Sequence, residues 1–101
     1  MHLLTIMKQV TDAKLDRYFK VTGTALKKAK LSKNLSEKEK KLALQFRDFC
    51  QRYFEDAKYF REKGDYVTAF AALNYAHAWL DAGAIQGLFD VKGQDKLFSV
   101  D

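Results

Sequence analysis

The chain contains no proline, the residue that most strongly interrupts helices. Apolar residues make up 48% of the sequence, which is typical of a globular protein and not of a disordered one. A length of 101 residues is enough for one hydrophobic core and too short for two. Together these features favour a single all-α domain and argue against a loop-rich or all-β fold.

Three segments carry apolar residues at helical spacing, and we expect helices near residues 11–31, 36–63 and 65–86. Ser36 and Glu39 form a capping-box pattern at the start of the second segment. Gly64 then ends that helix and Asp65 caps the next, so these two helices must fold back as a hairpin. We therefore predict an antiparallel up-and-down three-helix bundle over residues 1–88, without a β-sheet. Residues 89–101 have no helical period and form a short irregular tail, which either docks loosely or is disordered.

The apolar stripes indicate how the helices pack. The second helix has one stripe, formed by Leu42, Phe46, Phe49, Tyr53, Ala57 and Phe60. The third helix has two stripes, the first formed by Tyr66, Ala69, Phe70, Leu73, Ala76, Leu80 and Ala84, and the second by Ala72, Tyr75, Trp79, Ala82 and Ile85. We expect the first of these to meet the second helix and the other to meet the first helix. In that arrangement Tyr75 and Trp79 lie mostly in the core, with Trp79 at its edge; without that cover they form an aromatic patch suited to an interface.

The net charge of +5 is unevenly distributed. Residues 1–41 contain eleven Lys and Arg against four acids, whereas residues 42–101 contain seven against nine. The basic excess is concentrated in a lysine cluster, which consists of Lys27, Lys28, Lys30, Lys33, Lys38, Lys40 and Lys41. This cluster either contacts phosphates of a nucleic acid, weakly, or is ordinary solvated surface that partly offsets a helix dipole.

A polar line interrupts the third helix at Asn74, His77 and Asp81, which share one face. The line is either the solvated edge of the helix, with His77 and Asp81 loosely paired, or a ligand site. A metal site needs a further ligand, and His2 is the only other histidine. We therefore expect no metal, no cofactor and no catalytic site.

The lone Cys50 cannot form an internal disulfide and is expected to pack as a small side chain. A single cysteine without a disulfide partner fits the reducing interior of a cell. The apolar run at the N-terminus is too short for a signal peptide or a membrane span. We expect a cytoplasmic protein with no membrane partner.

Residues 53–89 resemble the archaeal domain-of-unknown-function family 357. The matching residues are Asp56, Ala57, Lys58, Tyr59, Phe60, Gly64, Asp65, Ala69, Phe70, Tyr75, Ala76, Trp79, Leu80, Asp81, Ala82, Gly83 and Gly87. Ala78 departs from the family pattern, in which glycine is frequent, and its methyl group could shift a close helix contact. The resemblance implies an archaeal, cytoplasmic helical bundle and brings no established activity.

Three functions compete. The first is a non-catalytic protein-interaction or accessory module that uses Tyr75, Trp79 and the polar line, as a monomer or weak homodimer. The second is a nucleic-acid-associated accessory protein that uses the lysine cluster. The third is a small-molecule or metal-dependent enzyme built on Asn74, His77 and Asp81. We favour the first, with another protein as the partner.

Overall fold

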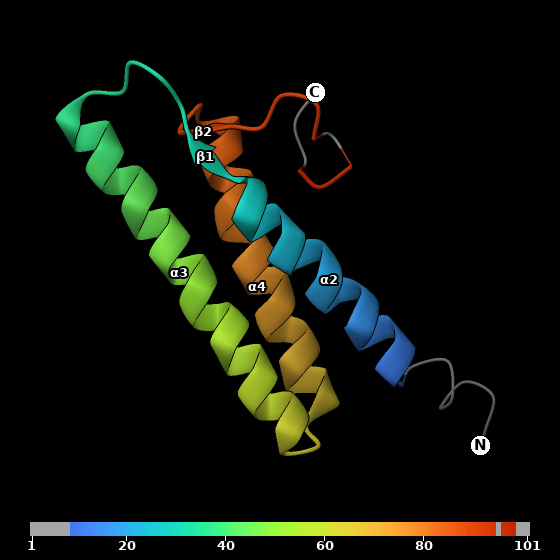
Figure 1. Ribbon diagram of the computed structural model, residues 1–101. Helices are drawn as coiled ribbons and strands as arrows, with labels where there is room; N and C mark the ends of the chain where they lie inside the picture. Colours follow the sequence, from blue (N-terminus) through green and yellow to red (C-terminus); the bar gives the residue numbers. More distant parts are fainter. Residues whose placement is uncertain (1–8, 95, 99–101) are drawn as a thin grey trace.

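The structure is a computed structural model that describes residues 9–94 and 96–98. Three helices run up, down and up along the bundle: α2 (Asp12–Lys28), α3 (Glu37–Glu62) and α4 (Tyr66–Ile85) (Figure 1). Two short strands, β1 (Lys30–Leu31) and β2 (Phe89–Asp90), lie at the upper end. The predicted all-α three-helix bundle is therefore confirmed.

Local hydrogen bonds explain the ends of the helices. At the start of α3, the Glu39 amide donates to Ser36 Oγ at 3.1 Å and the Ser36 amide donates to Glu39 Oε1 at 2.9 Å, which is the predicted capping box. Asp65 accepts from the Thr68 amide at 3.1 Å and caps α4, also as predicted. Gly64 and Gly87 follow α3 and α4 with φ of 80° and 75°, the left-handed conformation that closes a helix C-terminus.

Small side chains form much of the core. The buried column of α3 is Ala43, Cys50 and Ala57, at seven-residue spacing. Ala57 belongs to the predicted stripe of α3 and is buried as expected, whereas the aromatic members of that stripe flank the column and are only half-buried. The first stripe of α4 is core as predicted, with Ala69, Leu73, Ala76 and Leu80 each 0% exposed. Alanine at these positions lets the helix backbones approach closely, because a methyl group adds little width.

The prediction that the fold has no β-sheet is wrong in one detail. Leu31 pairs with Phe89 and Lys30 with Asp90 in an antiparallel ribbon, which the Ser32 amide extends by donating to the Leu88 carbonyl at 2.9 Å. The ribbon forms because α2 and α4 end side by side and the turn at Gly87 redirects the chain (Figure 1). Two-residue strands have no periodicity that a sequence pattern could reveal.

The described part of the C-terminal tail packs against the bundle. Leu88, Phe89 and Phe98 are buried together with Ala76 and Leu80 of α4. Of the two alternatives for the tail, docking therefore holds for residues 89–94 and 96–98. Residues 1–8, with His2, and residues 99–101 lie outside the described residues.

Candidate functional site

An aromatic face joins α3 to α4. We define it as Phe46, Phe49, Tyr53, Tyr75 and Trp79. Trp79 stacks on Phe49 with ring centroids 4.6 Å apart and meets Phe46 edge-on at 5.0 Å. Tyr75 stacks on Tyr53 at 5.4 Å. Each such ring pair contributes about 0.5–1.5 kcal/mol to stability, in addition to the hydrophobic free energy of the surface that it buries.

The expected cover of Tyr75 and Trp79 by the first helix is not found. The ring partners that the structure gives these two residues all lie on α3. Tyr75 is 62% exposed, so its assignment to the core was wrong, whereas Trp79 is half-buried at the edge of the core as predicted. The reason is geometric: α2 packs against the other side of α4, where Tyr18 meets Phe70 at 4.8 Å.

The polar line of α4 faces the junction with α2. Asn74, His77 and Asp81 line a small pocket of about 240 Å³ together with Tyr18 and Thr22. The interpretation of a solvated edge is wrong for His77, because its side chain is only 19% exposed. His77 Nδ1 lies 3.1 Å from Thr22 Oγ1, and Nε2 lies 2.6 Å from the Leu97 carbonyl oxygen.

These contacts give His77 a structural role, because they join it to α2 and to the C-terminal segment. The Leu97 carbonyl can only accept, so Nε2 carries a proton and donates to it. His77 thereby ties α4 to both α2 and the C-terminal segment. The loose pairing expected with Asp81 is present, at 3.8 Å. Within the described residues, no group of three or more His, Cys, Asp or Glu side chains is arranged to hold a metal ion.

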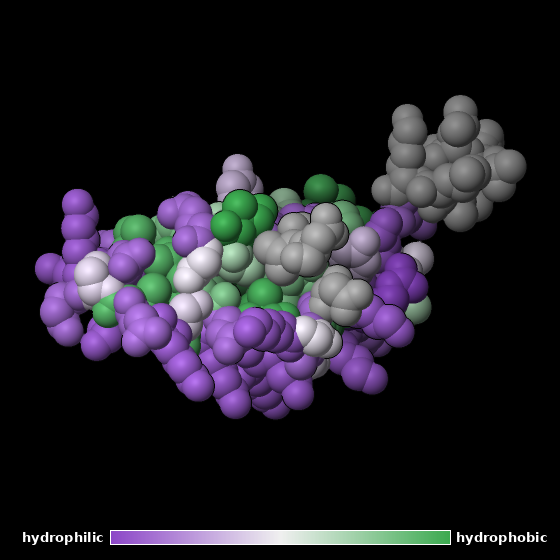
Figure 2. Space-filling view, turned by 90° about the horizontal axis from the view of Figure 1, so that it is seen from above, coloured by the Kyte–Doolittle hydropathy of each residue, from purple (hydrophilic) through white to green (hydrophobic). Residues whose placement is uncertain are grey.

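The lysine cluster lies toward the upper end of the bundle, at the end of α2 and the start of α3 (Figure 1). All seven of its side chains are exposed. Lys40 pairs with Glu37 at 3.3 Å across one turn of α3, which reduces the local positive charge. Seen from above, hydrophilic residues gather at both ends and along one long edge of the molecule, and exposed hydrophobic surface lies between them (Figure 2).

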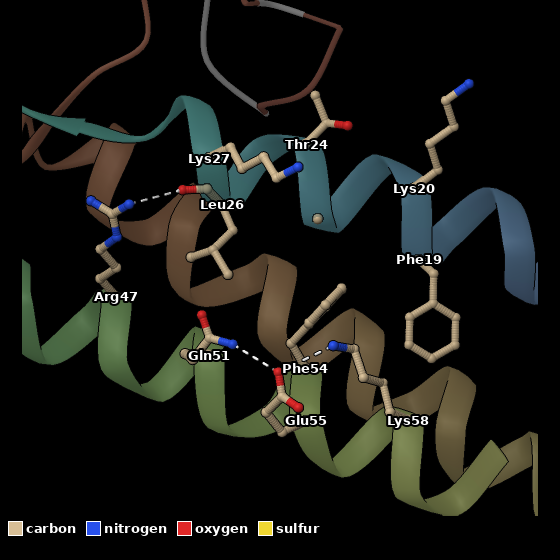
Figure 3. A pocket seen from close by; sticks show the side chains of 11 residues that line it. Phe19, Lys20, Thr24, Leu26, Lys27, Arg47, Gln51, Phe54, Glu55 and Lys58 are labelled. Carbon is tan, nitrogen blue, oxygen red and sulfur yellow. Dashed lines mark hydrogen bonds and ion pairs between the residues drawn. The ribbon is translucent and has the colours of Figure 1, made fainter. Parts of the chain in front are cut away.

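A groove that we did not predict lies between α2 and α3 (Figure 3). Its volume is about 630 Å³. The lining residues are Phe19, Lys20, Gly23, Thr24, Leu26, Lys27, Arg47, Gln51, Phe54, Glu55 and Lys58. The groove exists because α2 and α3 each pack on α4 more closely than on each other.

Arg47 closes one end of this groove by capping α2. Its guanidinium donates to the Ala29 carbonyl at 3.2 Å and to the Leu26 carbonyl at 3.4 Å. These carbonyls lack helical partners because α2 ends at Lys28, three residues earlier than we expected. The sequence signal for the groove was weak: Gly23 interrupts an otherwise good helix, and Arg47, Phe54 and Lys58 lie off the predicted stripe of α3.

Two further polar features are structural. The buried Cys50 thiol is 0% exposed, as predicted, and burial raises its pKa to about 12 although Arg47 opposes the shift.

At the lower end of the bundle, Tyr66 and Arg61 donate hydrogen bonds to Asp12. These hydrogen bonds, that of Tyr66 most strongly, hold the pKa of the Asp12 carboxyl below its usual value. Arg61 also pairs with Asp16 at 2.6 Å, which ties the first turns of α2 to the α3–α4 hairpin.

None of the described helices is long and apolar enough to cross a membrane. Comparison with curated proteins and with solved structures gives no match. One family model does match, described as "Protein of unknown function (DUF357)", and it covers residues 17–89. That range includes most of α2, all of α3 and α4, and the start of β2. The chain therefore belongs to the DUF357 family, as its sequence pattern led us to expect.

Proposed function

We propose that this protein is a non-catalytic interaction module whose aromatic face contacts another protein. The observation that carries the proposal is the exposure of Tyr75, which presents 62% of its surface to solvent within an ordered row of rings. Aromatic side chains held in place by neighbours lose little conformational entropy on binding, and tyrosine and tryptophan are enriched at binding hot spots. The proposal keeps the cytoplasmic location that a lone buried cysteine favours.

The contacts of His77 support a non-catalytic function. Both of its ring nitrogens lie within hydrogen-bond distance of structural partners on α2 and on the C-terminal segment. A general base needs a nitrogen within reach of the substrate proton. His77 would have to release one of these contacts first, which would loosen the packing of three segments.

The test places a photo-crosslinking amino acid at position 75 and expresses the variant in the native host. Position 67 gives a matched control, because Val67 lies on the same helix and is 67% exposed but is outside the aromatic face. We expect a discrete crosslinked partner from position 75 and none from position 67. The partner is then purified, and its affinity is measured for the unmodified protein and for Tyr75→Ala.

A loss of affinity of about tenfold or more in Tyr75→Ala, with unfolding free energy unchanged, is the expected result for a hot-spot residue. Equal crosslinking from both positions, or an unchanged affinity, would contradict the proposal. A crosslink to a second copy of the chain would instead identify the aromatic face as a homodimer interface. Sedimentation velocity over a range of concentrations distinguishes that case.

The exposed lysine cluster supports a second candidate, an accessory protein that binds nucleic acid. We expect only weak binding to generic DNA or RNA at physiological salt, because the cluster contains no arginine and is diluted by Glu37 and Glu39. Binding should fall steeply as salt rises, since it rests on released counterions. Sub-micromolar affinity, abolished by reversing Lys27, Lys28 and Lys30, would place this function ahead of the first.

A further inference from the structure

The groove between α2 and α3 combines an apolar floor with basic walls. Phe19 and Phe54 meet edge to face at 5.6 Å, with Leu26 beside them in the lining. The glycine at position 23 keeps the α2 wall open, because a Cβ there would already lie 3.3 Å from the Phe54 ring. A larger side chain at this position would project into the groove.

The charges around the groove are predominantly positive. Four of the lining side chains are cationic and one is a carboxylate, Glu55. Lys27 extends from α2 toward the middle of the groove, Lys58 lies along the α3 wall with its ammonium group toward Glu55, and Lys20 points away from the groove (Figure 3). Glu55 accepts hydrogen bonds from Gln51 at 2.9 Å and from Lys58 at 3.3 Å. The positive charge of Lys27 is therefore not neutralised by a carboxylate of the groove lining.

The size of the groove indicates the class of ligand. A volume of about 630 Å³ lies within the usual range for small-molecule sites, roughly 300–1,000 Å³. The α2 wall extends only from Phe19 to Lys27, or about 12 Å of helix. A stable protein interface usually buries about 800 Å² on each partner, which requires a much larger surface.

We propose that this groove binds a small organic anion with an aromatic body. The anionic group lies between Lys27 and Lys58, and the aromatic body packs on Phe19 and Phe54. Lysine suits this role because its ammonium group is a mobile point charge that adapts to carboxylate, sulfate or phosphate geometry. The site is separate from the aromatic face, which belongs to α3 and α4, so either proposal can fail without the other.

Fluorescence titration of the full chain with anilinonaphthalene sulfonate tests the proposal, because this probe is an aromatic sulfonate that brightens in apolar surroundings. We expect saturable binding that the Lys27→Ala, Lys58→Ala double substitution weakens about tenfold, or about 1.4 kcal/mol. Lys28→Ala is the matched control, since Lys28 is an exposed neighbour of Lys27 outside the groove, and it should change the affinity less than twofold. Circular dichroism checks that every variant is folded.

Two further variants separate the groove from other apolar surfaces. Gly23→Met should abolish binding by filling the groove, and Tyr75→Ala should leave binding unchanged. If Tyr75→Ala removes the signal while the lysine substitutions do not, the probe binds the aromatic face and the proposal fails. It fails equally if Lys28→Ala weakens binding as much as the loss of Lys27 and Lys58, because the effect is then one of net charge.

Competition experiments test the two halves of the ligand. Adenosine monophosphate should displace the probe at lower concentration than either inorganic phosphate, which has the charge alone, or adenosine, which has the aromatic body alone. Equal displacement by inorganic phosphate would overturn the requirement for an aromatic body. Equal displacement by adenosine would overturn the requirement for an anion.

Discussion

The contact between Gly83 and Phe89 gives the sharpest test of how the C-terminal segment is held. Gly83 lies in the last turn of α4, and the Phe89 ring of β2 packs directly on it. A Cβ at position 83 would lie 2.3 Å and 2.6 Å from two carbons of that ring. Unbonded carbons normally approach to about 3.5–4.0 Å. In Gly83→Ala the ring must therefore move by more than about 1 Å.

Two opposing effects determine the change in stability. Alanine favours the helix interior over glycine by about 1 kcal/mol. Phe89 is only 3% exposed, however, and displacing its ring from the core costs about 1.5–3 kcal/mol of buried apolar surface. The repulsion that remains in a tightly packed core adds a further 1 kcal/mol or so. We expect Gly83→Ala to lower the free energy of unfolding by about 1.5–3 kcal/mol.

Urea denaturation followed by far-ultraviolet circular dichroism measures this change. Gly23→Ala is the matched control: Gly23 is also a glycine within a helix, but a Cβ there would lie 3.3 Å from Phe54, so the ring needs to move by only a few tenths of an ångström. We expect this control to be neutral or up to about 1 kcal/mol more stable. Adding Phe89→Leu to Gly83→Ala should recover part of the loss. A Gly83→Ala variant as stable as the unmodified chain would refute the reasoning.

Three other predictions follow from the packing and the ionisable groups. Trp79→Ala should lower the free energy of unfolding by about 2–3 kcal/mol and Tyr75→Ala by less than about 1 kcal/mol, in urea denaturation; equal losses would contradict the burial described above. The lowered pKa of Asp12 means that its carboxylate stabilises the fold at neutral pH and that this contribution is lost as the pH falls below 3.8, so Asp12→Asn should flatten the acid side of the stability profile. A profile unchanged by the substitution would argue against the hydrogen bonds to this carboxylate. The buried Cys50 thiol, with a pKa raised to about 12, should not react with Ellman's reagent at pH about 8 until the chain is unfolded, and rapid reaction of the folded protein would show that it is accessible.

The order of the helices and the ends of α3 and α4 could be predicted because local interactions determine them, whereas α2 ends three residues earlier than expected. The capping box at Ser36 and Glu39 satisfies amides of a single turn, and Gly64 and Asp65 act within a few residues of each other. Because the chain contains no proline, no helix-breaking residue opposes these local signals. Once α3 and α4 are joined by so short a turn, their antiparallel packing follows.

Which faces meet was decided only by the tertiary structure. The two stripes of α4 are similarly apolar, so the sequence did not distinguish the side that α2 covers from the side that holds Tyr75 and Trp79. The buried column of α3 consists of small residues such as Ala43 and Cys50, because close helix packing excludes the large aromatic residues that we had assigned to the core.

The candidate sites also divide into those that the sequence reveals and those that only the fold creates. The exposed lysine cluster could be read from the sequence because charged side chains stay in water. The groove between α2 and α3 could not, because its walls come from residues about thirty positions apart whose separation depends on how each helix packs on α4. His77 likewise became a link between three segments only when folding brought Thr22 and Leu97 to its two nitrogens. Local patterns therefore specify the elements of this protein, and the packing of α2 on α4 specifies its surfaces.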